Sequence, residues 1–125
     1  MKQIIQTDQA PAPIGPYNQA VRAGNLLFIS GQIALKPGTG ELVDESVPAE
    51  TEQVMQNLQA ILSAAGSGFQ QVVKTTIFLS DMALFAAVNE VYGSYFSGEF
   101  PARETVAVKG LPKNVRVEIS MIATV

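Results

Sequence analysis

The 125-residue sequence is 47% hydrophobic and 15% charged, which is the size and composition of one globular domain. It contains no cysteine and no histidine, which excludes disulfides, thiol nucleophiles, thiolate metal sites and histidine-based catalysis. The net charge is -3 and the basic residues are scattered, which disfavours nucleic-acid binding through phosphates and favours a small, neutral-to-anionic ligand.

The chain as a whole is expected to form a single domain, residues 1–125, because no repeat, low-complexity tract or linker divides it. The first 17 residues lack the apolar core of a signal peptide. No apolar run approaches the length that spans a bilayer. We therefore expect a cytoplasmic protein that does not enter the membrane.

The first third of the chain predicts short strands and an extended arm. The run "IIQ" at residues 4–6 is typical of a short strand. The proline-rich "APAPIGPY" at 10–17 predicts a fixed arm, because each residue before a proline is driven out of the helical region. Residues 17–35 predict two strands joined by a tight turn at Gly24–Asn25.

Two amphipathic helices are predicted further along the chain. Ser46 caps the first helix, which ends at Gly66, and Ser80 or Asp81 caps the second, which ends near Gly98. The apolar positions are Val54, Leu58, Ile61, Leu62 and Ala65 in the first helix, and Leu84, Phe85, Val88, Tyr92, Tyr95 and Phe96 in the second.

Three further strands complete the predicted fold, at residues 70–80, 104–108 and 115–125. The side chains expected against the helices are Val73, Thr75, Ile77 and Leu79, followed by Val115, Val117, Ile119, Met121 and Ala123. The order β-β-β-α-β-α-β-β predicts an α+β fold, with two helices on one face of a mixed sheet.

The opposite face of this sheet mixes polar and apolar side chains. Its two rows are Val72, Lys74, Thr76 and Phe78, and Arg116, Glu118, Ser120, Ile122 and Thr124. Such a surface suits contact with another subunit, and we therefore expect an oligomer. The alternative is a solvated sheet face on a monomer, since single exposed apolar residues are common.

Arg103 is the first candidate for chemistry, in the segment "FPARETVAVKGLPKNVRVEI". It follows a proline turn and enters a strand, so its side chain leaves a stiff base. A planar guanidinium in such a place favours bidentate binding of a carboxylate. A surface salt bridge explains the same pattern equally well.

Glu118 is the second candidate, since it lies mid-strand in the apolar context "VRVEISM". A carboxylate there is unfavourable unless it is paired or functional. The alternative to a functional role is an ion pair with Arg116 or Lys74.

Two further positions are candidates for a pocket. Tyr17 offers a wall with a hydroxyl group, although it equally fits the edge of a core. Gly31 after Ser30 allows a ligand to approach the backbone, although a simple bulge explains the glycine as well. No glycine pair has the phosphate-binding pattern of a nucleotide loop.

The runs "APAPIGPY", "FISGQI", "VVKTTIFLSDM" and "FAAVNEVYGSYF", and above all "PAR" followed by "LPK" and "VEI", resemble the Rid/YjgF family of reactive-intermediate deaminases. The resemblance covers essentially the whole chain. It implies a chorismate-mutase-like α+β fold, a homotrimer with three sites between subunits, and no cofactor. It also implies hydrolysis of 2-imino acids or their enamine tautomers to 2-keto acids and ammonia.

The resemblance also implies residue roles. Arg103 matches the arginine that binds the substrate carboxylate, assisted by the backbone N–H of Thr105, and Glu118 matches the carboxylate that positions water. The matching pocket positions are Tyr17, Ser30, Gly31 and Asn89.

The chain departs from the family pattern at Glu104, where a small residue is usual, and at Thr105, where cysteine is common. Alternation along the strand directs Glu104 away from Arg103. The branched Thr105 narrows the pocket and leaves the preferred imino acid open. Two other functions stay open: non-catalytic binding of keto acids, and RNA cleavage or translation inhibition, which the acidic chain disfavours.

Overall fold

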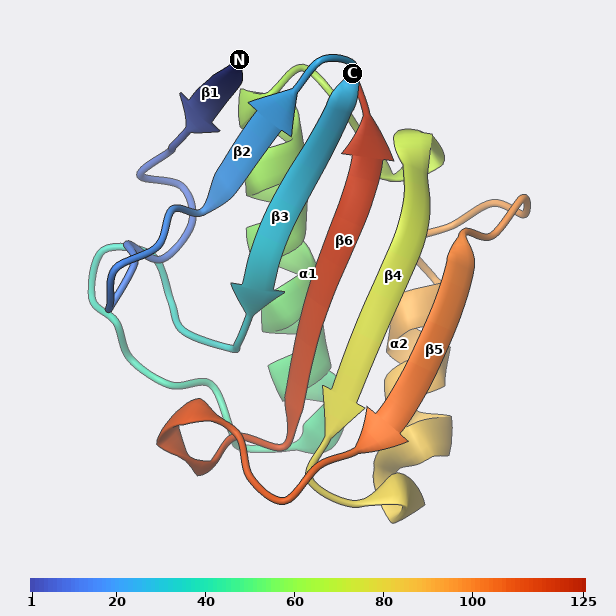
Figure 1. The fold of residues 1–125 in the computed structure, drawn as a ribbon. Helices are drawn as coiled ribbons and strands as arrows, with labels where there is room; N and C mark the ends of the chain where they lie inside the picture. The colour runs from blue at the N-terminus through green and yellow to red at the C-terminus, as the bar shows by residue number, and fades with distance from the viewer.

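The computed structural model describes residues 1–125, which form a six-stranded sheet in the order β1-β2-β3-β6-β4-β5 (Figure 1). The strands are β1 (Lys2–Ile5), β2 (Ala20–Ala23), β3 (Leu26–Gln32), β4 (Val72–Leu79), β5 (Ala102–Ala107) and β6 (Val117–Thr124). The helices are α1 (Val47–Ala64) and α2 (Phe85–Gly93), with short 3-10 turns at Phe69–Gln71, Met82–Leu84 and Pro112–Asn114. Strands β4 and β5 pair in parallel and the other neighbours are antiparallel.

Both helices lie behind one face of the sheet, α1 across its middle and α2 behind β4 and β5 (Figure 1). The predicted mixed sheet with two helices on one face is therefore confirmed. No helix is both long and apolar enough to cross a membrane.

Helix α1 begins and ends where the sequence predicts. The Ser46 hydroxyl accepts a hydrogen bond from the Ala49 N–H at 3.1 Å, which satisfies one free donor of the first turn. After the helix, Gly66 adopts a left-handed φ of 76°, a conformation that favours glycine. Between these ends the predicted apolar stripe packs against the sheet, with Val54, Leu58, Ile61 and Leu62 fully buried.

Helix α2 is shorter than predicted. Asp81 caps a 3-10 turn, Met82–Leu84, and the α-helix itself ends at Gly93. Tyr95 and Phe96 therefore lie beyond the helix, yet both rings pack edge-to-face on Phe69. The apolar pattern continued past the helix because the following turn also packs on the core.

One predicted buried position in β4 is wrong. Val73 was expected against the helices, but 46% of it is exposed and Val72 is buried instead. The pairing of β4 with β6 shifts register between Val72 and Lys74, so alternation restarts there. From Thr75 onward the expected side of the strand is buried.

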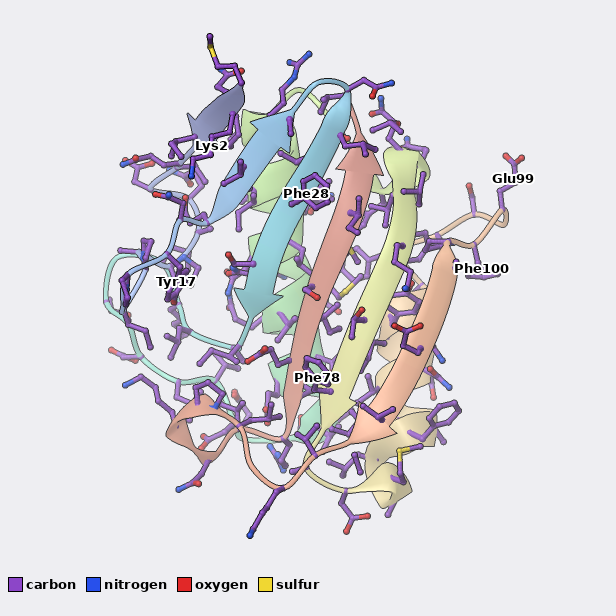
Figure 2. The ribbon with its side chains drawn as sticks, viewed as in Figure 1. Lys2, Tyr17, Phe28, Phe78, Glu99 and Phe100 are labelled. Atoms are coloured by element: carbon purple, nitrogen blue, oxygen red, sulfur yellow. The ribbon has the colours of Figure 1, made fainter.

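The helix-free face of the sheet carries the mixed rows that the sequence predicts, apart from Val72, which is buried, and Arg116, which lies before β6 and binds Glu50 of α1. Phe28 of β3 and Phe78 of β4 lie on this face, which is turned toward the viewer in Figure 2. An ion pair joins Lys74 to Glu104 at 3.2 Å. The sheet therefore presents an apolar surface interrupted by charges.

Candidate active site

Glu118 lies against the backbone of Gly31. Strand β3 shifts register relative to β6 between Ile29 and Gln32, and Gly31 sits in this irregular stretch. A Cβ atom at Gly31 would lie 2.8 Å from the Glu118 carboxyl carbon, so a side chain there would force the carboxylate to move. The irregular pairing expected as the alternative at this glycine is present, and the group that lies against its backbone is the Glu118 carboxylate, whereas the approach of a ligand stays a prediction.

The Glu118 carboxylate has no ion-pair partner in the chain. Neither predicted alternative partner is available, because Lys74 pairs with Glu104 and Arg116 pairs with Glu50. Burial raises the pKa of Glu118 above that of an ordinary glutamate. An unpaired, partly buried carboxylate of this kind is suited to accept a proton.

A cavity of about 380 Å³ opens beside this carboxylate, and its wall includes Tyr17, Ser30, Gly31, Gln32, Pro112 and Glu118. Tyr17 is 45% exposed, and its hydroxyl accepts a hydrogen bond from the Ile14 N–H at 3.2 Å, which leaves the hydroxyl proton free to donate. The Ser30 hydroxyl donates to the Asn18 carbonyl at 2.6 Å and so ties the arm to β3. Of the predicted residues, this cavity collects Tyr17, Ser30, Gly31 and Glu118.

Gln19 also lines this cavity, and no sequence signal pointed to it. Its side-chain amide is buried, accepts from the Thr7 N–H at 2.8 Å and donates to the Pro11 carbonyl at 2.9 Å. The amide thereby holds the proline-rich arm that carries Tyr17. A single glutamine before a strand forms no sequence motif, so the role of Gln19 in holding the arm becomes visible only in the folded structure.

Arg103 lies on the other side of the sheet. It pairs with the buried Thr75 of β4, so its side chain is directed toward α2. The guanidinium carbon lies 5.6 Å from the centre of the Phe85 ring and 5.1 Å from that of Tyr92. No carboxylate in the chain pairs with it. The predicted alternative of a salt bridge is therefore absent, and the guanidinium N–H groups are available to an anion.

Asn89 and Thr105 are the predicted residues nearest to Arg103, the first across a hollow and the second along the same strand. Asn89 and Arg103 line one hollow of about 310 Å³ between α2 and the start of β5. Thr105 follows two residues after Arg103 on the same side of the strand, and its hydroxyl oxygen is buried with no hydrogen-bond partner. An unsatisfied buried hydroxyl is unfavourable by roughly 1–3 kcal/mol.

The candidate residues thus form two groups that one chain does not bring together. Glu118 pairs with Phe78 on the helix-free face, whereas Arg103 pairs with Thr75 on the helix side. The two backbones are about 10 Å apart along the strands and two strand spacings of about 4.8 Å apart across the sheet. No three acidic side chains lie close enough together to hold a metal ion.

The sequence and fold have close counterparts among known proteins. A family profile described as Endoribonuclease L-PSP matches residues 7–125. The mouse protein named 2-iminobutanoate/2-iminopropanoate deaminase is 49% identical over 98% of this chain and 91% of its own length. The chain belongs to the Rid family, also called YjgF or L-PSP.

Solved Rid structures share the fold over nearly their whole length. RidA from an Antarctic Psychrobacter is 46% identical with a TM-score of 0.95, and the match covers 98% of this chain and 99% of that one. TdcF from E. coli, solved with bound serine, is 40% identical with a TM-score of 0.94 and 98% coverage of both chains. The family resemblance and the YjgF-type fold expected from the sequence are therefore confirmed.

Proposed function

We propose that this Rid protein hydrolyses small 2-imino acids, or their enamine tautomers, to 2-keto acids and ammonia. The observation that carries the proposal is the pair of unbalanced charges: the Arg103 guanidinium and the Glu118 carboxylate both lack an ionic partner in the chain. An imino acid offers a carboxylate for the first and an electrophilic carbon for the second. The mouse relative is named for deamination of such compounds, and TdcF was solved with an amino acid.

The complete site requires two chains, and the proposed assembly is a homotrimer with three inter-subunit sites. Arg103 and Glu118 point from opposite faces of the sheet, so one chain cannot bring both to one small molecule. The mixed apolar and charged face around Phe28 and Phe78 supplies a surface for a neighbouring subunit. Each site then takes Glu118, Tyr17 and Gly31 from one chain and Arg103 from the next.

The proposed reaction assigns each group one task. Arg103 and the Thr105 N–H hold the carboxylate, while Glu118 accepts a proton from water as the water oxygen bonds to the imine carbon. The C=N electron pair moves to nitrogen, which takes the proton from Glu118. The hydroxyl proton of the resulting carbinolamine then passes by way of Glu118 to the amine nitrogen as the C–N bond breaks, which releases ammonia and leaves the C=O of the keto acid. Tyr17, Ser30 and Asn89 shape the pocket, and the preferred imino acid depends on the space beside Thr105.

A coupled assay tests this function directly. A pyridoxal-phosphate-dependent threonine dehydratase releases an unstable enamine, and the protein is added while 2-ketobutyrate is measured. Keto-acid release should accelerate above the spontaneous rate in proportion to the added protein. Binding of 2-ketobutyrate without acceleration would instead select a non-catalytic metabolite binder.

The family description also names an endoribonuclease. The net charge of -3 and the scattered basic residues provide no strip for an RNA backbone. RNA cleavage that persists through purification and is lost in Arg103→Ala would favour that second function.

The single-domain organisation and the cytoplasmic location remain predictions.

A further inference from the structure

Phe85 and Tyr92 surround the Arg103 guanidinium from one face of α2. They are seven residues apart, which is about two helical turns or 10.5 Å along the axis. The guanidinium carbon lies 5.6 Å from one ring centre and 5.1 Å from the other, so it is in contact with both rings. Asn89 lies between them on the same face and lines the same hollow.

The Tyr92 ring is held in place by a hydrogen bond from its hydroxyl group. Its hydroxyl donates to the Thr75 hydroxyl at 3.0 Å, and both residues are buried. Thr75 is the β4 residue paired with Arg103 in the sheet. The hydrogen bond therefore connects the ring to the strand pair that carries the arginine, and burial raises the pKa of Tyr92 so that its hydroxyl stays a donor.

The rings orient the arginine without occupying its donors. A flexible arginine loses side-chain freedom when it binds a ligand, whereas ring faces attract the cation and restrict it beforehand. No protein carboxylate takes the guanidinium N–H groups, which remain for the ligand. We propose that Phe85 and Tyr92 are positioning residues that preorganise Arg103 and so make the site selective for planar carboxylates.

This inference rests on the proposed function, because it concerns the same arginine, and Phe85 allows a clean test. Phe85 is 37% exposed, so its replacement disturbs the core little. Phe85→Leu and Phe85→Met remove the ring but keep an apolar side chain, and Phe85→Tyr keeps the ring. The binding of 2-ketobutyrate by calorimetry, the KM and kcat for imine hydrolysis, and thermal melting are measured for each protein.

Loss of the ring should weaken carboxylate binding without changing chemistry. Phe85→Leu and Phe85→Met are expected to raise the Kd for 2-ketobutyrate and the KM by about 2- to 30-fold, with kcat and melting nearly unchanged. Phe85→Tyr should retain the parent Kd. The neutral amide of 2-ketobutyrate should bind all variants equally weakly, because it lacks the charge that the arginine selects.

The possible failures are distinguishable. Equal Kd values for the parent, Phe85→Leu and Phe85→Met, or equal weakening by Leu and Tyr, would overturn the positioning role and leave the proposed function intact. A parent protein that binds no 2-ketobutyrate and hydrolyses no imine would overturn the proposed function and this inference together.

Discussion

Two ionisable side chains, Arg103 and Glu118, stand out at the scale of single residues because no protein charge balances them. The other arginine of the same segment, Arg116, is occupied: it holds Glu50 at 2.8 Å. The ion pair identifies Arg116 as a structural arginine, whereas Arg103 is free for the proposed binding of a carboxylate, and the sequence pattern alone does not distinguish the two. The first three predictions test these two residues.

Replacement of Arg103 tests whether geometry or charge holds the ligand. Arg103→Lys should fail almost as badly as Arg103→Ala, because an ammonium group cannot reproduce a paired, planar contact. The loss of a charge-assisted hydrogen bond weakens binding by about 1.5–3 kcal/mol, or roughly ten- to a hundredfold in Kd for 2-ketobutyrate. Full activity of Arg103→Lys would show that only charge matters at this position.

Replacement of Glu118 separates catalysis from binding. Glu118→Gln keeps the shape of the side chain and removes the base, so the variant should fold and bind 2-ketobutyrate nearly as the parent does. Imine hydrolysis above the spontaneous rate should fall by roughly 10²–10⁴. Hydrolysis at the parent rate would show that Glu118 has only a structural part in the site.

The raised pKa of Glu118 also predicts two pH profiles. Activity requires the ionised base, so kcat/KM should fall on the acid side at a pH above the usual range of a glutamate. Because burial favours the protonated form, the folded state loses stability relative to the unfolded state as pH rises through this pKa. Glu118→Gln should therefore melt higher than the parent at pH 8, and the gap should close toward pH 4. A constant gap would argue against the shift.

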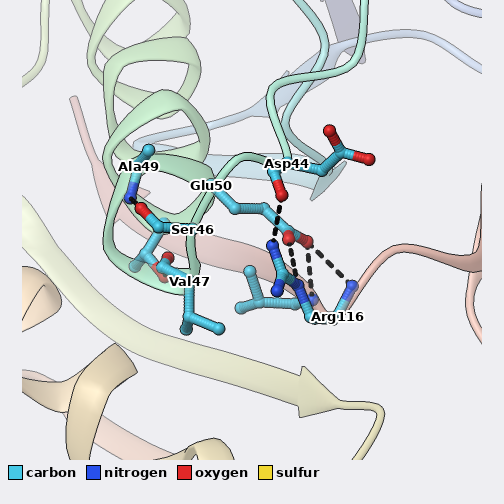
Figure 3. Close-up of polar contacts among 8 residues, drawn as sticks. Asp44, Ser46, Val47, Ala49, Glu50 and Arg116 are labelled. Atoms are coloured by element: carbon cyan, nitrogen blue, oxygen red, sulfur yellow. Dashed lines mark hydrogen bonds and ion pairs between the residues drawn. The ribbon is translucent and has the colours of Figure 1, made fainter.

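At the scale of elements, Glu50 connects α1 to the start of β6. Its carboxylate, 1% exposed, accepts from the Arg116 N–H and the Arg116 Nε–H at 2.8 Å and from the Val117 N–H at 3.3 Å (Figure 3). The guanidinium of Arg116 also donates to the Asp44 carbonyl at 2.8 Å. The helix thereby fixes the point where the chain enters the strand that carries Glu118.

Removal of this contact should destabilise the whole fold. Glu50→Ala leaves Arg116 and two backbone N–H groups without their acceptor, and because Arg116 is partly exposed, the loss should fall below the roughly 3–5 kcal/mol typical of a fully buried pair. Glu50→Gln keeps one acceptor oxygen and should cost less. Urea unfolding of the two variants against the parent measures both values, and equal stability of Glu50→Ala and the parent would contradict the structural role.

The ends of a helix were predictable from the sequence where local capping signals set them. Which side of a strand is buried was harder to predict, because it depends on pairing with a distant strand. Ser46 and Gly66 mark the ends of α1 because capping and left-handed backbone are local properties. The predicted buried side of β4 is wrong at Val73 because the register shift depends on the pairing with Ile122 and Ala123 of β6, which lie far along the chain. The end of α2 was placed too late because Tyr95 and Phe96 are apolar for contact with Phe69 rather than for helix formation.

At the scale of the whole molecule, the proposed division of the site between two chains leads to a mixing experiment. Arg103→Ala and Glu118→Gln subunits are each expected to be inactive alone. If they are unfolded together and refolded at equal amounts, random trimers should place an intact Arg103 beside an intact Glu118 in about a quarter of the sites. Mixtures should therefore regain about a quarter of the parent activity.

Sedimentation of the parent should report three chains. A stable monomer at micromolar concentration, or mixtures that stay inactive although both variants assemble, would contradict a site shared between subunits. From the sequence, sites between subunits were implied only by the family resemblance, and the residues themselves did not indicate that Arg103 and Glu118 would come from different chains. Alternation assigns Arg103 and Glu118 to faces of their own strands, but only the pairing of β5 and β6 with β4 shows that these faces are opposite.

The contact between Gly31 and Glu118 has a consequence for how this protein can diverge. A Cβ atom at Gly31 would meet the Glu118 carboxylate in its present position, so a side chain there requires Glu118 to move. Because this carboxylate is the flexible end of its side chain, it can turn away, and alanine at Gly31 is expected to displace the proposed base rather than to unfold the sheet. A relative that has gained bulk at Gly31 is therefore expected to keep the fold and to hydrolyse imines poorly.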